Sequence, residues 1–248
     1  MGLPQLSIPE YTLKLPSDGK EITYRPFLVK EEKLLLIAME SEDEEQILRA
    51  TKRVIQSCVH QNLDVDNMPT FDFEYVFLWL RAKAKGEEIN LKYKCPKCDG
   101  EIPLAINIED VKIKKTKSHS TKIELTDNLG VVFKYPSLSL QFKIDNHKFE
   151  SEVEKIFTSV LSCIDFIYDA KETYSTKDHT EKELTDFLES LTDVQFQKLA
   201  KFFETMPILK HEAVLVCKNK IKEEGKKKEK ICDFREDITL EGLQSFFD

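Results

Sequence analysis

Two cysteines separated by two residues are the side chains in this sequence whose type and spacing best suit chemistry. Cys95 and Cys98 lie in "CPKCDG", near the tip of a predicted β-hairpin over residues 89–111. Zinc binds four ligands in a tetrahedron, and a C-x2-C pair on a tight turn supplies two of them. Half a site holds no metal tightly, so any further ligands must come from elsewhere in the chain or from a partner.

Cys217 and Cys232 are the candidates for the second half of such a site. Fourteen residues separate them, and this lysine-rich segment is expected to extend a hairpin whose paired strands bring the two cysteines together. Three interpretations stay open. The two pairs form one four-cysteine zinc site across two lobes; Cys95 and Cys98 bind zinc with help from a histidine or a partner; or the cysteines are remnants or buried thiols without metal. The sequence alone favours the third.

The remaining motifs give little support to catalysis. None of the five histidines forms H-E-x-x-H, and the chain contains neither a G-x-S-x-G elbow nor a Walker motif. Cys58 and Cys163 fall at apolar helix positions, which predicts core thiols, because a free cysteine packs as a small hydrophobe. We therefore expect no enzyme and no small-molecule substrate. A zinc-containing redox or hydrolytic enzyme remains the competing hypothesis, to be tested by metal analysis and thiol titration.

Charge and composition limit the partners. The 248 residues carry a net charge of −8, which disfavours nucleic acid, although two lysine-rich loops leave a nucleic-acid-binding zinc ribbon as a further alternative. No apolar run is long enough for a membrane span, and the N-terminus shows no signal-peptide pattern. Six cysteines without a secretion signal suggest a reducing cytosol, where thiols or metal ligands are more common than disulfides.

The elements that would position these cysteines alternate between hairpins and amphipathic helices. Turn residues predict a hairpin over residues 10–29, and the capping-box spacing of Ser41 and Glu44 predicts a helix over 42–60. Thr70 and Gly86 bound a helix rich in aromatic residues. A second hairpin (121–136), three more helices, a strand, the lysine-rich loop and a final helix complete the predicted order.

This order repeats. "YTLKLPSDGKEITYRPF" (11–27) aligns with "TKIELTDNLGVVFKYPS" (121–137), and the six cysteines fall into two triplets in the same order. We interpret the repeat as an internal duplication. The predicted fold is α+β, with two similar lobes that each contain a β-hairpin, amphipathic helices and a cysteine-bearing hairpin. The first lobe spans 1–111, a lysine-rich linker spans 112–120, and the second lobe spans 121–248 with a degenerate cysteine hairpin.

Three segments resemble the baseplate hub proteins of T4-like bacteriophages. They are "YRPFLVKEEKLLLIAMES" after the "LKLPSDGK" turn, "FDFEYVFLWLRAKAKGEEINLKYKCPKC", and "DITLEGLQSFF" near the end of the chain. The resemblance covers most of the sequence. It implies a structural or assembly role in which no active-site residue is carried over. The long segment between Cys217 and Cys232 departs from a compact second knuckle, which puts a conventional zinc site there in doubt.

The family includes both a hub subunit and an assembly factor for the hub, and these motifs do not separate the two. Either role implies other baseplate or hub proteins as partners. It also implies a place in the host cytoplasm during tail assembly and, for a subunit, in the tail baseplate of the virion. Contacts between proteins, rather than catalysis, are then the expected activity.

Overall fold

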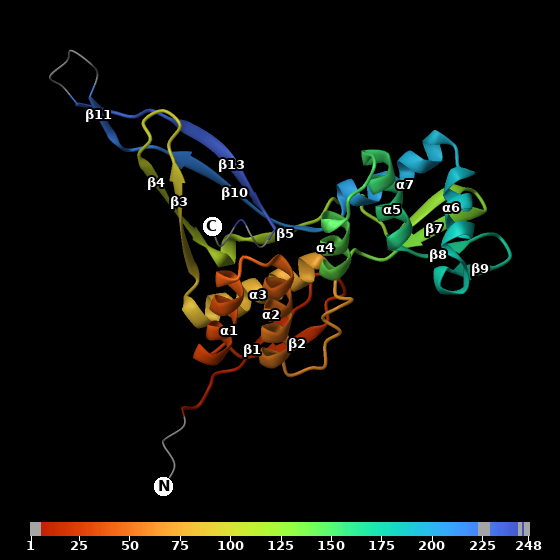
Figure 1. Cartoon of the computed structure of the whole chain (residues 1–248), viewed down its shortest axis with the longest axis horizontal. Helices are drawn as coiled ribbons and strands as arrows, with labels where there is room; N and C mark the ends of the chain where they lie inside the picture. Colours follow the sequence, from red (N-terminus) through yellow and green to blue (C-terminus); the bar gives the residue numbers. More distant parts are fainter. Residues whose placement is uncertain (1–5, 223–228, 243–244, 246–248) are drawn as a thin grey trace, which may run out of the picture. The chain divides into compact units, whose positions relative to one another are not determined.

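The computed structural model describes residues 6–222, 229–242 and 245, and combines helices with small antiparallel sheets (Figure 1). The predicted α+β class is confirmed. The chain forms two compact units. The first unit contains residues 1–65, 71–114 and 208–248, and the second contains 66–70 and 115–207. Among the described residues, no helix is both long and apolar enough to cross a membrane.

The first unit is built from three helices and several short strand pairs. Its strands pair as β1–β2, β3–β4 and β11–β12, with a three-stranded sheet in the order β13–β10–β5. The elements are β1 (Tyr11–Lys14), β2 (Glu21–Tyr24), α1 (Val29–Glu40), α2 (Glu44–Cys58), α3 (Thr70–Lys85), β3 (Glu88–Lys94), β4 (Glu101–Asn107), a 3-10 turn (Ile108–Asp110), β5 (Lys112–Lys114), β10 (Ile208–Val216), β11 (Lys220–Lys222), β12 (Glu229–Ile231) and β13 (Arg235–Glu241).

The start of α2 differs from the prediction by two residues. Asp43, not Ser41, is the N-cap, since its carboxylate accepts hydrogen bonds from the backbone N–H groups of Glu45 and Gln46. Ser41 instead ends α1, and Glu42 has a φ of +53° that separates the two helices. The spacing of Ser41 and Glu44 in the sequence did not show that Ser41 is the C-cap of α1.

The pairing of strand β10 determines which residues belong to the first unit. The strand lies between β5 and β13, with Leu209 opposite Ile113 and Val216 opposite Arg235. Residues 112–114 of the predicted linker therefore form a strand, and residues 208–248 belong to the first unit instead of a lobe spanning 121–248. Backbone pairing between strands distant in sequence, which local patterns do not reveal, produces this difference. Residues 235–241 form a strand, and the final helix expected near the end of the chain lies largely outside the described residues.

Helix α3 is the centre of the first unit. Its aromatic and aliphatic side chains are buried around most of its circumference, as expected for a helix enclosed by neighbouring elements. One side of α3 packs on the β3–β4 hairpin and on β10. This cluster contains Leu78, Ala82, Ile89, Leu91, Ile106, Ile108, Val111, Leu209 and Leu240. The cluster holds the base of the β3–β4 hairpin in place and so fixes the direction of its tip.

A buried carboxylate joins α3 to the first hairpin. Asp72, in the first turn of α3, accepts hydrogen bonds from the backbone N–H of Ser17 at 3.0 Å and from the Ser17 hydroxyl. Burial raises the pKa of Asp72 to about 6, and the two hydrogen bonds from Ser17 only partly oppose this effect. The turn between β1 and β2 is thereby fixed to α3.

The second unit has its own core. Its four-stranded sheet, in the order β6–β7–β8–β9, packs against α5 and α7 around Val131, Val160 and Phe202. The elements are β6 (Lys122–Thr126), β7 (Leu129–Phe133), α4 (Leu138–Asn146), α5 (Glu152–Cys163), β8 (Ile164–Tyr168), β9 (Thr173–Ser175), a 3-10 turn (Thr176–Asp178), α6 (Glu181–Glu189) and α7 (Asp193–Thr205).

The two units share one local arrangement. In each, a β-hairpin precedes two helices, and the second helix ends at a buried cysteine. The carbonyl of Cys58 accepts a hydrogen bond from Arg25 N at 2.9 Å, and the carbonyl of Cys163 accepts one from Lys134 N at 2.8 Å. These parallels agree with the repeat in the sequence, and the internal duplication stays a prediction.

Candidate metal centre

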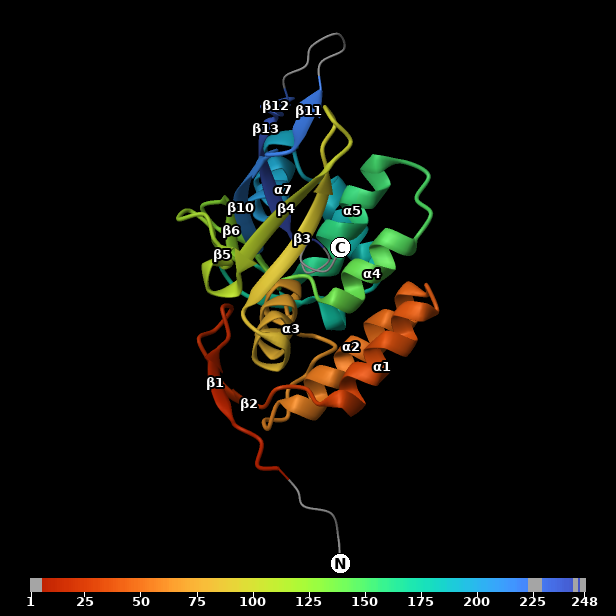
Figure 2. The same ribbon diagram turned by 90° about the vertical axis from the view of Figure 1, so that its left-hand side faces the viewer.

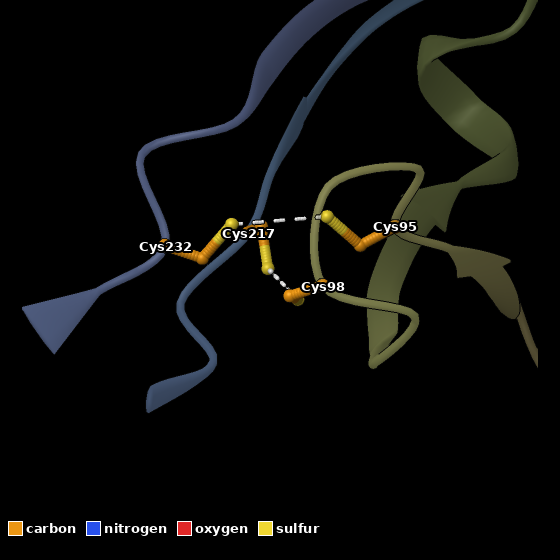
Figure 3. Close-up of side chains that lie close together, drawn as sticks. All are labelled: Cys95, Cys98, Cys217 and Cys232. Atoms are coloured by element: carbon orange, nitrogen blue, oxygen red, sulfur yellow. Dashed lines mark hydrogen bonds between the residues drawn. The ribbon is translucent and has the colours of Figure 1, made fainter. Parts of the chain in front are cut away.

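The sulfur atoms of Cys95, Cys98, Cys217 and Cys232 meet in one cluster within the first unit (Figure 3). All four Sγ atoms lie within 4.8 Å of one another. The Sγ atoms of Cys95 and Cys232 are 3.8 Å apart, and those of Cys98 and Cys217 are 3.6 Å apart. Each of these short distances joins a cysteine of one hairpin to a cysteine of the other.

The first pair lies in the turn that connects β3 to β4. These strands pair up to Lys94 and Glu101, and the ladder continues into the turn, where Cys95 N donates to the carbonyl of Gly100 at 2.9 Å. Asp99 has a φ of +57°, a left-handed conformation that aspartate tolerates better than most residues. The turn thus points Cys95 and Cys98 to the same side.

The second pair lies where β10 and β13 approach each other. Cys217 N donates to the carbonyl of Phe234 at 3.0 Å, and Cys232 N donates to the carbonyl of Asn219 at 2.8 Å. In the intervening segment β11 pairs with β12, and both strands lie beyond the ends of β10 and β13 (Figures 1 and 2). Cys217 and Cys232 are therefore neighbours, as hairpin pairing predicts, although fourteen residues separate them.

The structure differs from the expectation that a joint site would lie across two lobes. All four cysteines belong to the first unit, because β10 and β13 carry Cys217 and Cys232 to the β3–β4 hairpin. Among the described residues, the potential ligands that gather in this way are the four cysteines, without a histidine. The arrangement therefore does not support a site in which a histidine of this chain completes the Cys95–Cys98 pair.

The cluster is sealed on most sides. Cys95, Cys217 and Cys232 are buried, while Cys98 is partly exposed. The polar neighbours are Asn219, whose side chain donates toward the sulfurs, and an exposed ion pair between Lys97 and Asp233. The apolar wall consists of Tyr93, Ile102, Leu104, Leu215, Ile221, Phe234 and Ile238.

The family model for the T4 bacteriophage base plate protein matches residues 8–248. The chain belongs to this family. It is thus a structural protein of a T4-like phage baseplate, which makes other phage proteins its partners and the virion tail its place. Comparison with curated proteins and with solved structures gave no significant match.

The four thiols of this baseplate protein do not ionise alike. The backbone N–H of Gly100 donates to Cys98, which lowers the pKa of that thiol to about 7. Burial raises the pKa of Cys217 to about 12. The Phe234 N–H lowers the pKa of Cys232, but burial and the neighbouring Cys95 and Cys98 outweigh it, so that the net direction is upward. One thiolate therefore forms easily, and further ionisation at the cluster requires a compensating positive charge.

The spacing of the sulfurs suits a tetrahedral metal ion. A zinc–sulfur bond of about 2.3 Å in a regular tetrahedron places neighbouring sulfurs about 3.8 Å apart. The two short sulfur–sulfur distances, 3.6 and 3.8 Å, agree with that value. Four cysteine ligands would complete the coordination shell, so a metal bound here would keep no position for substrate.

Sequence reasoning identified the four cysteines but missed Asn219. Its carboxamide Nδ2 lies 3.3 Å from Cys217 Sγ and 3.8 Å from Cys98 Sγ. The one available signal was its position two residues after Cys217, which matches the position of Gly100 after Cys98. A side chain that reaches from one hairpin to another leaves no periodic pattern in the sequence.

Proposed function

We propose that this protein is a hub component or a hub assembly factor of the phage baseplate and acts through contacts with other tail proteins. The family match over residues 8–248 is the observation that carries the proposal. This match supports an activity in the baseplate that depends on contacts between proteins. In this proposal the protein acts first in the host cytoplasm during tail assembly, and nucleic acid is not a partner.

The surface of α1 supports a role in binding other proteins. Val29 is 79% exposed, Leu36 51% and Ile37 54%. These positions, seven and eight residues apart, share one face of the helix, and the buried Ala38 lies on the opposite face. Apolar side chains gathered on one exposed face often mark a contact with a partner.

Pull-down of tail proteins tests the proposal. We expect the wild-type chain to capture baseplate hub proteins and the Leu36→Asp variant to capture less of them. Val194→Asp is the matched control, because Val194 is also an exposed apolar helix residue (70%), on α7 of the second unit. Failure of the wild type to bind any tail protein, together with normal baseplates in its absence, would overturn the hub role. Undiminished capture by Leu36→Asp would overturn the role of α1.

We further propose that the four cysteines bind one structural zinc ion. The two sulfur–sulfur distances carry this proposal, since they agree with a tetrathiolate tetrahedron. Burial of three of the four ligands and the full set of cysteine donors support a closed, structural site over a catalytic one. The metal would join the β3–β4 hairpin to β10 and β13.

Elemental analysis of the purified protein tests the zinc proposal. We expect one zinc per chain in the wild type and in Cys58→Ser, and far less in Cys232→Ser. Iron in place of zinc would overturn the identity of the metal, because the same four-sulfur geometry also suits iron. Two disulfides, detected as the loss of two hydrogen atoms for each bond, would overturn metal binding altogether.

A further inference from the structure

The carboxamide of Asn219 joins the two cysteine-bearing hairpins at the cluster. Its Nδ2 donates to the backbone carbonyl of Glu101 at 3.0 Å and to Cys217 Sγ at 3.3 Å, and lies 3.8 Å from Cys98 Sγ. The carbonyl of Glu101 can only accept a hydrogen bond, which requires the NH₂ end of the carboxamide to face the cluster. The Asn219 side chain therefore contacts the backbone of β4 and Cys98 on the β3–β4 hairpin, and also Cys217 in its own segment.

Gly100 provides the space that Asn219 occupies. A Cβ added to Gly100 would overlap the Asn219 carboxamide and lie 2.9 Å from its Cγ. The φ of Gly100 is not in the left-handed region, so that space, rather than backbone conformation, is what favours glycine at this position. The two residues form a fitted contact between the hairpins.

The contact between Asn219 and Gly100 lies beside the sulfur atoms, whose negative charge must be stabilised when they bind a metal. Four thiolates around a divalent ion leave a net charge of −2, and N–H donors to sulfur reduce the cost of holding that charge away from water. Gly100 N–H donates to Cys98, Asn219 N–H donates to Cys217, and Phe234 N–H donates to Cys232. The Asn219 side chain adds a further donor at the place where Cys98 and Cys217 approach most closely.

We propose that Asn219 is a positioning residue for the metal. Its NH₂ group orients the thiolates of Cys217 and Cys98 and fixes the distance between the hairpins through the Glu101 carbonyl. This inference rests on the proposed zinc site and adds to it a side chain that tunes the affinity for the metal. Hydrogen-bonding partners of metal ligands commonly contribute a factor of about 10 to 100 in metal affinity.

Competition with a chromogenic chelator measures this contribution. We expect Asn219→Ala to weaken zinc binding about 10-fold to 100-fold. Asn219→Asp should weaken it further, because a carboxylate of the same shape would face the thiolates. Gly100→Ala should also weaken binding by displacing the carboxamide. Asn90→Ala is the matched control and should leave the affinity unchanged, since Asn90 is a strand residue of the same β3–β4 hairpin whose side chain bonds to Glu88.

Cobalt substitution separates positioning from a general loss of stability. Without the N–H donor, the sulfur-to-cobalt charge-transfer band of Asn219→Ala should move to longer wavelength, while the tetrahedral ligand-field bands persist. Asn219→Asp provides the same readout if the alanine variant does not fold. Wild-type affinity and an unshifted band in the variants would overturn the role of Asn219 and leave the zinc site intact. Absence of zinc or cobalt binding by the wild type would instead overturn the zinc site itself.

Discussion

Cys58 and Cys163 lie at the ends of helices α2 and α5, whereas the sulfur atoms of the other four cysteines meet in one cluster. Cys58 and Cys163 are as buried as Cys95, Cys217 and Cys232, whereas Cys98 is partly exposed. Apolar side chains surround Cys163 in the core of the second unit. Burial raises the pKa of Cys58 to about 11 and that of Cys163 to about 12. Burial thus outweighs the nearby Arg25 at Cys58 and Lys134 at Cys163, and it leaves both thiols protonated and inert.

Three of the four clustered cysteines differ from these two in their neighbours rather than in their burial, and the fourth, Cys98, is partly exposed. Backbone N–H groups two residues further along the chain donate to three of the four sulfurs. The same pattern of donors is suited to thiolates held by a metal ion. Burial raises the pKa of Cys217 to about 12, as it does for Cys163, so the gathering of four sulfurs with N–H donors, rather than burial, sets the cluster apart. This difference can be tested by changing one residue from each group.

The largest expected effect is the loss of one clustered cysteine. Cys232→Ser should lose the metal, and a ligand present at 1,000 times its Kd contributes about 4 kcal/mol of stability. For a chain of this size that corresponds to a fall in Tm of about 8–16 °C. Cys163→Ala should cost only about 1 kcal/mol, in line with small core truncations. Calorimetry of both variants, with and without a chelator, measures the difference.

The chelator is the internal control for this comparison. It should lower the Tm of the wild type and of Cys163→Ala by similar amounts and leave that of Cys232→Ser almost unchanged. If the chelator has no effect on the wild type, or if both substitutions cost the same, the two groups of cysteines do not differ as described.

The next largest difference between the clustered and the lone cysteines is expected in their thiol reactivity in metal-free protein. The pKa of Cys98 is lowered to about 7, which leaves much of it as reactive thiolate at pH 8, and its side chain is partly exposed. Cys58 and Cys163, with pKa values raised to about 11 and about 12, stay protonated at that pH. We expect alkylation of Cys98 to accelerate as pH rises through 7 and then level off. Cys58 and Cys163 should react only after unfolding.

Peptide mapping by mass spectrometry over time gives these rates. Zinc should protect Cys98 in the loaded protein without changing the slow reaction of Cys58 and Cys163. Early modification of Cys163 in folded protein at pH 7 would contradict the assignment of the lone cysteines as inert.

The smallest effect is expected from Lys97. Its ammonium group pairs with Asp233, which raises its pKa, and Cys232 and Cys95 act in the same direction. Both members of the ion pair are exposed, and exposed pairs contribute little. Lys97→Ala should therefore weaken zinc binding only a few-fold, much less than Asn219→Ala. A larger loss than that of Asn219→Ala in the chelator competition would show that long-range charge, rather than the N–H donors, controls the site.

Local patterns in the sequence predicted many elements of this fold. The turn residues between β1 and β2 and the apolar spacing of α2 placed a hairpin and a helix within a few residues of their observed positions. Apolar helical spacing also predicted that Cys58 and Cys163 are core residues, and both are buried. These features depend on neighbours close in sequence, which is why one sequence was enough to find them.

Pairing between distant segments could not be predicted. The contact of β10 with β5 links residues about a hundred positions apart, and it carries Cys217 and Cys232 into the first unit. Because the sequence does not reveal this pairing, the sequence analysis favoured remnant or buried thiols without a metal. Asn219 was missed for a related reason, because its role depends on the carbonyl of Glu101 on another hairpin.

X-ray absorption at the zinc edge of the purified protein tests the central claim most directly. Four sulfurs bound to one zinc predict a single shell at about 2.3 Å, without lighter ligands. The same shell in Cys58→Ser and its loss in Cys232→Ser would assign it to the cluster. A shell that contains nitrogen or oxygen, or wild-type protein that contains no metal and six titratable thiols, would contradict the claim.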